Sequence, residues 1–312
     1  MTDSTLAFVF PGQGSQKIGM LREIAEQFSV VKDSFAEASE ALEYDLWDMI
    51  QNGEQDQLNL TERTQPILLT SSVALWRVWQ EKNGVMPSVM AGHSLGEFSA
   101  LVCAGSLSFS DAVSLVRDRG QFMQTAVPVG VGAMAAILGL EDDVIVDICK
   151  KTGAEAVNFN SPGQVVIAGK VAAVEQAIEQ LKEAGAKKAM ALPVSAPFHT
   201  SLMKPAGEKL AEKVAGLKIS SPAIPVIHNV HAQKENDPEK IKALLVRQIS
   251  SPVNWRGCVQ AMIDGGISTI VECGPGKVLS GLGKRIHKPL KTCNIESPDG
   301  LEKALAEVLA DS

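Results

Sequence analysis

Residues 89–96 read VMAGHSLG, an apolar run followed by the pattern Gly-x-Ser-x-Gly. Between a buried strand and a helix, this pattern is typical of the nucleophile elbow of α/β enzymes. Gly92 and Gly96 permit a turn too tight for a side chain, which presents the Ser94 hydroxyl at the open end of a sheet. We expect a helix at residues 95–104, with its first N–H groups facing a developing oxyanion. The stretch predicts an α/β fold and acyl transfer through a serine ester.

Outward from the elbow, short apolar strands alternate with amphipathic helical patterns. Before the elbow, the patterns predict a strand at 6–10 and helices at 21–42 and 64–83. After it, they predict a helix at 111–125, with Ser110 or Asp111 as its N-cap. The alternation returns later, with predicted helices and strands at 201–215, 224–229, 238–249, 254–264 and 269–273. Such alternation predicts a parallel sheet covered by helices on both faces.

Between residues 127 and 195 the order of the predicted elements changes to β-α-β-β-α-β. These elements lie at 132–140, 142–151, 156–159, 164–168, 171–184 and 188–194. This order is that of a ferredoxin-like domain. We expect a small inserted domain at 127–195 and a discontinuous, hydrolase-like α/β domain made of 1–126 and 196–312. The substrate would bind in the cleft between the two parts.

Composition excludes several classes of function. The chain has 312 residues, of which 45% are hydrophobic and only 4% aromatic, so aliphatic side chains must fill a sizeable core. A net charge of −7 argues against a nucleic-acid-binding surface, because phosphate binding needs clustered basic residues. Five scattered cysteines without a CxxC pair indicate reduced thiols. The first residues do not read as a signal peptide, and no apolar run approaches the roughly 18 residues that span a bilayer. We therefore expect a cytoplasmic protein.

A serine nucleophile needs a base to take its proton. His199 follows a predicted strand and precedes a predicted helix, and loops at strand ends are where catalytic groups gather. It is the candidate base, with an ordinary loop histidine as the alternative. His93 is expected to line or support the turn beside Ser94. No aspartate between Ser94 and His199 ends a predicted strand, so a dyad oriented by a neutral acceptor is more credible than a Ser-His-Asp triad.

A glycine-rich loop, FPGQGSQ at residues 10–16, follows the first predicted strand. It does not fit a dinucleotide-binding fingerprint, because Lys17 stands at the third-glycine position, and it does not fit a Walker motif. The backbone of this loop is instead expected to approach Ser94 and to supply an oxyanion N–H. Residues 274–277, GPGK, are interpreted as a turn.

Two arginines lie on the predicted helix at 111–125. Arg117 and Arg119 are two residues apart and must face different directions. One of them is expected to be a solvated surface charge. The other is a candidate clamp for a carboxylate in the cleft.

Four segments together resemble the family of malonyl-CoA:acyl carrier protein transacylases. They read FVFPGQGSQ at 8–16, GHSLGE at 92–97, RGQFM at 119–123 and PFH at 197–199. Residues 158–164, NFNSPGQ, and 246–248, VRQ, add to the match. The resemblance extends from the first strand to about Gly283, and the fold of the family agrees with the pattern described above.

The resemblance implies roles for the reacting groups. Ser94 would be acylated, and His199 would be the base. Gln248 would orient His199 through a neutral oxygen, which accounts for the missing aspartate. The backbone N–H groups of Gln13 and Leu95 would form the oxyanion hole.

The resemblance also implies an acyl pocket. Arg119 would hold the free carboxylate of malonyl in a bidentate pair, and Met123 would line the same pocket. His93 and Asn160 are further implied substrate-binding residues. Phe198 stands where many bacterial members of the family have serine, and its ring is expected to crowd an α-methyl group. This favours malonyl over methylmalonyl.

The implied reaction is a ping-pong transfer of malonyl from malonyl-CoA to the pantetheine thiol of acyl carrier protein, feeding fatty-acid synthesis. It needs no metal or redox cofactor, since malonyl-CoA is a substrate. We expect a monomer without nucleic-acid or membrane partners. Because such carrier proteins are acidic, the docking patch is expected among basic residues, namely Lys187, Lys188, Lys284, Arg285, Lys288 and Lys291.

Two other functions remain open from the residues alone. A serine thioesterase or esterase would use the same elbow, but a hydrolase of neutral acyl chains has no use for a buried Arg119. A non-catalytic carrier-binding protein on this fold is the other alternative. The joint presence of Ser94, His199 and Arg119 argues against it.

Overall fold

The computed structural model describes residues 2–194 and 196–311. Within them, the larger sheet has six strands in the order β10-β9-β1-β2-β7-β8. These strands are β1 (Thr2–Phe10), β2 (Met86–Gly92), β7 (Val226–His228), β8 (Gln233–Lys234), β9 (Thr269–Glu272) and β10 (Lys291–Asn294). The first five strands in this order form four parallel pairs, as predicted, whereas β8 pairs with β7 in the antiparallel sense. Only a few residues join β7 to β8, too few for the crossover that a parallel pair requires.

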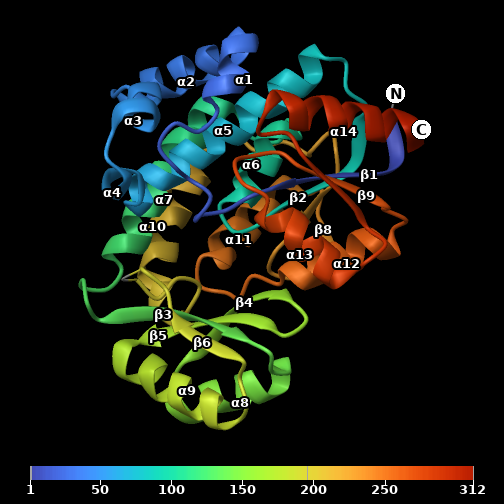
Figure 1. Cartoon of the computed structure of the whole chain (residues 1–312). Helices are drawn as coiled ribbons and strands as arrows, with labels where there is room; N and C mark the ends of the chain where they lie inside the picture. The colour runs from blue at the N-terminus through green and yellow to red at the C-terminus, as the bar shows by residue number, and fades with distance from the viewer. Residues whose placement is uncertain (1, 195, 312) are drawn as a thin grey trace.

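Helices cover both faces of this sheet (Figure 1). The core on one face includes residues of α1 (Arg22–Gln27), α2 (Ser29–Leu42), α3 (Leu46–Asn52), α4 (Gln55–Leu58), α5 (Thr61–Glu81), α6 (Gly96–Cys103), α7 (Phe109–Thr125), α10 (Lys204–Ala215), α11 (Pro238–Gln248) and α14 (Pro298–Asp311). The other face packs against α12 (Trp255–Asp264) and α13 (Val278–Ile286). None of the helices in the described ranges is both long and apolar enough to cross a membrane.

The central strand β1 shows why the sheet must be covered on both sides. Successive side chains of a strand point to opposite faces. Phe8 packs edge-on against Trp76 and Trp79 of α5, with ring centroids 5.2 and 5.1 Å apart. Ala7 and Val9 belong to the core on the opposite face. Because the buried part of β1 is an unbroken apolar run, it supplies apolar side chains to the cores on both faces of the sheet.

The second sheet lies below the first in Figure 1 and has the predicted ferredoxin-like arrangement. Its strands are β3 (Gly132–Leu138), β4 (Glu155–Ser161), β5 (Gln164–Lys170) and β6 (Lys188–Ala191), in the antiparallel order β4-β5-β3-β6. Helices α8 (Asp142–Thr152) and α9 (Val171–Glu183) cover one face and share a separate core with it. All these elements fall inside the predicted insertion. Its predicted last residue, 195, and the predicted ends of the larger domain, 1 and 312, lie outside the described residues.

Backbone hydrogen bonds tie the small sheet to the larger one. The N–H of Phe159 donates to the carbonyl of Val253 over 3.0 Å. The N–H of Val253 donates to the carbonyl of Val157 over 2.7 Å. The residues before α12 thus extend the edge of β4. This pairing fixes the end of β4, which carries Asn160, relative to the elbow.

Three local predictions are corrected by the structure. The helix predicted at 21–42 is two helices, because Phe28 adopts an extended conformation between α1 and α2. The cap of α7 is neither Ser110 nor Asp111 but Ser108, whose hydroxyl accepts from the N–H of Asp111 over 3.3 Å. The helix predicted at 201–215 begins as a 3-10 turn, Ser201–Met203, before α10. Helices α3, α4, α13 and α14 and strands β8 and β10 were not predicted.

Candidate active site

The elbow is a strained turn between β2 and α6. Ser94 has a left-handed backbone conformation, with φ of 51°, which L residues adopt only where the surroundings impose it. A Cβ on Gly92 would overlap the backbone of Gly96, and a Cβ on Gly96 would overlap the carbonyl of Phe10. Both glycines are therefore required for close backbone approach. The turn places the Ser94 hydroxyl beyond the carboxyl end of β2.

His199 meets Ser94 at this point. The Nε2 atom of His199 lies 2.8 Å from Oγ of Ser94, and its Nδ1 lies 2.9 Å from the main-chain carbonyl oxygen of Gln248. A carbonyl can only accept, so Nδ1 carries the proton and Nε2 is left to accept from the serine hydroxyl. No carboxylate of the described residues bonds to His199. Its orienting partner is a neutral main-chain oxygen at the end of α11.

Burial and charge keep the His199 imidazole neutral. The ring is 4% exposed, and desolvation, helped by the nearby charge of Arg119, lowers its pKa to about 3. The bond to the Gln248 carbonyl opposes this shift. His199 therefore remains a proton acceptor at neutral pH.

Arg119 is a buried cation beside the nucleophile. Its guanidinium is 3.3 Å from Oγ of Ser94, 2.8 Å from Oε1 of Gln248 and 2.7 Å from Oε1 of Gln65. It also lies over the ring of Phe98, 5.1 Å from the centroid. Burial lowers the pKa of Arg119 to about 10, which leaves it charged at neutral pH. No carboxylate among the described residues forms an ion pair with it, so only neutral oxygens and a ring face hold the charge.

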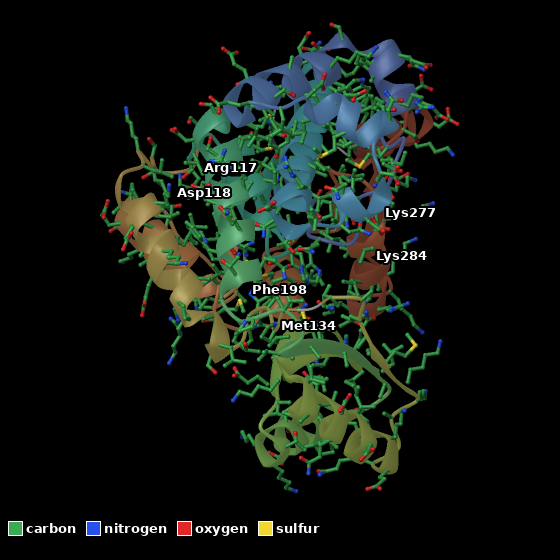
Figure 2. The ribbon with its side chains drawn as sticks, turned by 90° about the vertical axis from the view of Figure 1, so that its left-hand side faces the viewer. Arg117, Asp118, Met134, Phe198, Lys277 and Lys284 are labelled. Carbon is green, nitrogen blue, oxygen red and sulfur yellow. The ribbon has the colours of Figure 1, made fainter. Side chains whose placement is uncertain are left out.

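The two arginines of α7 are separated as the helix geometry requires. Arg117 points to the surface and pairs with Asp118 over 2.9 Å, whereas Arg119 is 1% exposed. Figure 2 shows Arg117 and Asp118 well away from Phe198 and Met134, which lie at the junction with the small sheet. Phe198 and Met134 are both buried in the larger core.

The glycine-rich loop lies against the elbow, as expected. The N–H of His93 donates to the carbonyl of Phe10 over 3.0 Å, and a Cβ on Gly12 would lie 2.6 Å from the carbonyl oxygen of His93. Within the described part of the chain, the N–H groups of Gln13 and Leu95 donate to no other atom. Leu95 is also the N-cap of α6, where the helix dipole favours negative charge.

The remaining predicted pocket residues fall into two groups. Met123 is buried, with its sulfur 3.8 Å from Nε2 of Gln65, on the same side as Arg119. On the other side, Nε2 of His93 lies 2.8 Å from Oδ1 of Asn160, so that the small sheet supports the elbow histidine. Burial lowers the pKa of His93.

Sequence reasoning missed a polar network beneath the elbow. Asn229, at the end of β7, accepts from the N–H of Ser94 over 2.8 Å and donates to the carbonyl of Gly92 over 2.7 Å. Glu97, fully buried on α6, accepts from Nδ1 of His228 over 2.7 Å. A carboxylate in an otherwise apolar, small-residue helix was a usable signal for Glu97. Asn229 is the last residue of the strand predicted at 224–229 and directly follows β7, but nothing in the sequence showed that this strand is the neighbour of β2.

The basic residues predicted to dock a carrier protein come from both parts of the molecule. Lys188 begins β6 and Lys187 directly precedes it, and Lys284 and Arg285 lie on α13. Arg285 donates to Oε1 of Gln164 at the start of β5, which links α13 to the small sheet. Lys291 instead pairs with Glu307 over 3.0 Å.

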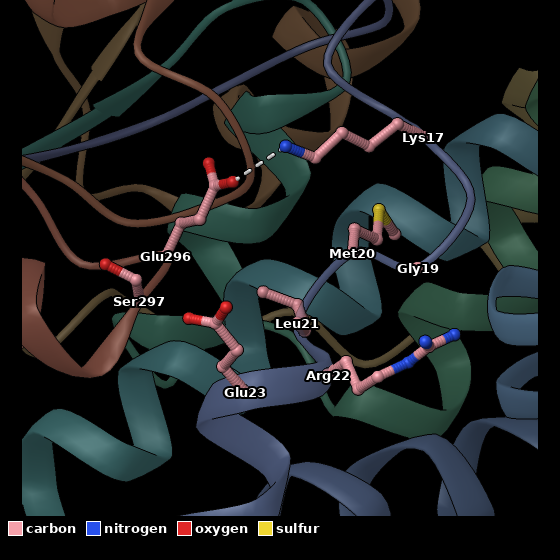
Figure 3. A pocket seen from close by; sticks show the side chains of 8 residues that line it. All are labelled: Lys17, Gly19, Met20, Leu21, Arg22, Glu23, Glu296 and Ser297. Carbon is pink, nitrogen blue, oxygen red and sulfur yellow. Dashed lines mark ion pairs between the residues drawn. The ribbon is translucent and has the colours of Figure 1, made fainter.

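A separate pocket of about 310 Å³ lies away from Ser94. It is lined by Lys17, Gly19, Met20, Leu21, Arg22, Glu23, Glu296 and Ser297. Figure 3 shows the ion pair across its rim, where Nζ of Lys17 lies 3.3 Å from Oε1 of Glu296. None of the predicted site residues lines it.

Comparison with known proteins places this geometry in a family. The profile of the acyl transferase domain family matches residues 7–297. The malonyl CoA-acyl carrier protein transacylase of Salmonella typhimurium is 53% identical over 305 residues, covering 96% of this chain and 99% of that protein. The Bacillus subtilis protein of the same name is 47% identical, covering 97% and 96%.

Solved structures agree. The acyl carrier protein S-malonyltransferase of Vibrio cholerae superposes with a TM-score of 0.95 at 55% identity, covering 96% of this chain and 99% of that one. A malonyl-transacylase solved in complex with a type II polyketide acyl carrier protein superposes with a TM-score of 0.96 at 50% identity, covering 97% and 99%. The chain belongs to the malonyl CoA-acyl carrier protein transacylase family of acyl transferases.

Proposed function

We propose that this protein transfers malonyl from malonyl-CoA to the pantetheine thiol of an acyl carrier protein, through a malonyl ester on Ser94. The observation that carries the proposal is the buried cation of Arg119, 3.3 Å from the Ser94 hydroxyl that is itself 2.8 Å from the neutral His199. A carboxylate-bearing acyl group would supply the anion that this cation lacks. The names of the relatives and the carrier-protein complex of one of them support the same reaction.

In the first half-reaction, Oγ of Ser94 attacks the thioester carbonyl while Nε2 of His199 takes its proton. The tetrahedral oxyanion accepts hydrogen bonds from the N–H groups of Gln13 and Leu95. Removal of one such donor typically costs about 3–4 kcal/mol of transition-state stabilisation. The C–S bond then breaks, and the departing CoA sulfur takes the proton from His199.

In the second half-reaction, His199 takes the proton of the pantetheine thiol, and the sulfur attacks the ester carbonyl. Collapse of the tetrahedral intermediate breaks the ester C–O bond, and His199 returns the proton to Ser94. The Gln248 carbonyl, at the C-terminal end of α11, faces the imidazole of His199. The partial negative charge of this helix end would stabilise the transient imidazolium by about 0.3–2 kcal/mol, the role that an aspartate has in a triad.

Arg119 would select the acyl group. A bidentate bond to the malonyl carboxylate is worth roughly 1.5–3 kcal/mol and has a directional requirement that neutral acyl chains do not meet. Phe198, next to the base, would limit the space at the α-carbon and so favour malonyl over methylmalonyl. The scheme uses no cofactor, because malonyl-CoA is consumed as a substrate.

Mass spectrometry of the intact protein tests the proposal. After mixing with malonyl-CoA and no acceptor, we expect one malonyl adduct on Ser94, absent in Ser94→Ala and removed by added pantetheine thiol. Ser99→Ala, which removes a buried hydroxyl with no partner in the described structure from α6, the helix that follows the elbow, is the matched control and should still form the adduct. Absence of any adduct would refute the enzyme. Release of malonate to water at the rate of release to thiol would indicate a hydrolase instead.

A further inference from the structure

Glu97 is a buried carboxylate with no role in the scheme above. It has no exposed surface and accepts hydrogen bonds from Nδ1 of His228, from the N–H of Asn229 over 2.9 Å and from Nε2 of Gln248 over 3.1 Å. Burial of a carboxylate is costly unless its oxygens are fully bonded. The arrangement meets that condition, and one of its bonds reaches a residue of the site.

The side chain of Gln248 joins Glu97 to Arg119. Its Nε2 donates to Oε2 of Glu97, and its Oε1 accepts from the Arg119 guanidinium over 2.8 Å. The same Nε2 lies 3.0 Å from the carbonyl oxygen of Ser94 and 3.4 Å from Oδ1 of Asn229, but Glu97 is the charged acceptor of the three and so the strongest. The amide is thus placed between an anion that can only accept and a cation that can only donate.

This placement determines which way the amide points. If it were reversed, the amide oxygen would face the Glu97 carboxylate, and the NH2 group would face the guanidinium. Both contacts would then be repulsive. Because Glu97 accepts from Nε2, the oxygen of Gln248 is directed at Arg119. Together with Gln65, which accepts from the other terminal nitrogen, that oxygen sets the orientation of the guanidinium beside Ser94.

We propose that Glu97 is a positioning residue for acyl selection: by accepting from Gln248 it holds the amide that orients Arg119 toward a carboxylate-bearing acyl group. The inference rests on the proposed role of Arg119. It differs from a general supporting role of Glu97 at the elbow. Loss of support through Asn229 and His228 would slow acylation of Ser94 by every acyl group, whereas disorientation of Arg119 slows acylation by malonyl in particular.

The test compares acylation of Ser94 by malonyl-CoA and by acetyl-CoA, followed as release of CoA thiol in a single turnover. Glu97→Met removes the acceptor at nearly constant length, and we expect the malonyl-to-acetyl ratio of kcat/KM to fall about tenfold, within the range of coupling seen in one polar network. Glu97→Gln keeps an oxygen that can accept from Gln248, with its nitrogen turned to His228. It should retain more than half of the wild-type ratio.

The matched control is Glu272→Met. Glu272 is an equally buried carboxylate, on β9, that accepts from the N–H groups of Leu279 and Ser280 and has no path to Arg119. It should lose stability but keep the wild-type ratio. If Glu97→Met does not fold, Gln248→Leu interrupts the same path from its middle while the main-chain oxygen for His199 remains. It should give the same fall in the ratio.

Arg119→Ala separates the positioning role of Glu97 from the proposed carboxylate clamp. In that background, Glu97→Met should change the ratio by less than twofold, because nothing remains to be oriented. If Arg119→Ala alone leaves the ratio unchanged, the proposed clamp is wrong. Two results would overturn the positioning role of Glu97 and leave the clamp standing. In the first, Arg119→Ala lowers the ratio but Glu97→Met and Gln248→Leu do not. In the second, Glu97→Gln lowers the ratio as far as Glu97→Met does.

Discussion

At the scale of single residues, the site is defined by which groups are charged and which are neutral. A buried cation, Arg119, lies beside a buried neutral base, His199, and both face Ser94. The cation disfavours protonation of the base and so keeps it ready to accept a proton. Two expected outcomes follow from this pairing of charges.

Replacement of Arg119 by Ala should lower kcat/KM for malonyl-CoA by roughly 10–150-fold, the equivalent of about 1.5–3 kcal/mol. Transfer of acetyl should be spared or improved, because a buried charge without a partner is removed. Arg117→Ala, on the exposed face of the same helix, is the control and should behave as the wild type for both substrates. An equal loss for malonyl and acetyl would contradict a carboxylate clamp.

The pH dependence should show the low pKa of His199. Because the pKa in the folded protein is lowered to about 3, the imidazole is neutral above that pH and protonates only below it. We expect kcat/KM for malonyl-CoA to stay flat on the acid side from about pH 8 to 5, with no decline near the ordinary histidine value of about 6.5. If kcat/KM does decline near pH 6.5, and the decline persists when each other histidine is replaced, then His199 is the group that titrates and is solvated in the working enzyme. Steady-state rates across this range measure it.

At the scale of elements, the ends of two helices supply main-chain hydrogen-bonding groups to the site. The start of α6 offers N–H groups at the nucleophile, and the end of α11 offers the Gln248 carbonyl to His199. Terminal helical groups lack intrahelical partners, which makes both available for chemistry. The helix that carries Arg119, α7, depends in turn on its own cap at Ser108.

Ser108→Ala should therefore destabilise the protein by about 1 kcal/mol, because the first turn of α7 loses its side-chain acceptor. The hydroxyl also donates to Oδ2 of Asp111 over 2.6 Å. Ser110→Ala removes an exposed hydroxyl two residues away and should have little effect. Denaturant unfolding of both variants measures the difference, and equal stabilities would show that Ser108 is not the effective cap.

At the scale of the whole molecule, the two sheets act as one frame. Backbone pairing of β4 with Val253 brings Asn160 to His93 at the elbow. The contact of Arg285 with Gln164 brings α13 against the small sheet. Arg285 therefore lies at the boundary between the two parts of the molecule. A charged partner would contact both parts at once.

Charge reversal at Lys284 and Arg285 should raise KM for acyl carrier protein at low salt, with the difference shrinking as salt is added. The KM for malonyl-CoA in the absence of carrier protein should change less. The double reversal Lys150→Glu with Lys151→Glu, at the exposed end of α8 away from α13, changes the net charge by the same amount and is the control. Unchanged kinetics on reversal at Lys284 and Arg285 would remove these two residues from the docking surface.

The sequence by itself determined the strand-turn-helix at Ser94, the alternation of the larger part and the order of the insertion. These depend on local periodicity and on glycines whose spacing permits close backbone approach. It did not determine the break at Phe28 or the antiparallel β8, since weak local signals there yield to packing and to short connections.

Only the tertiary structure decided which groups meet. The proximity of Arg119 rather than Arg117 to Ser94, the main-chain identity of the oxygen that orients His199, and the link from Glu97 through Gln248 to Arg119 all join residues 25 to 151 positions apart. Periodicity reports which face of an element is buried, not which neighbour it is buried against. The partners of buried polar groups are set by the order of strands and by the crossing of helices, and neither is encoded locally.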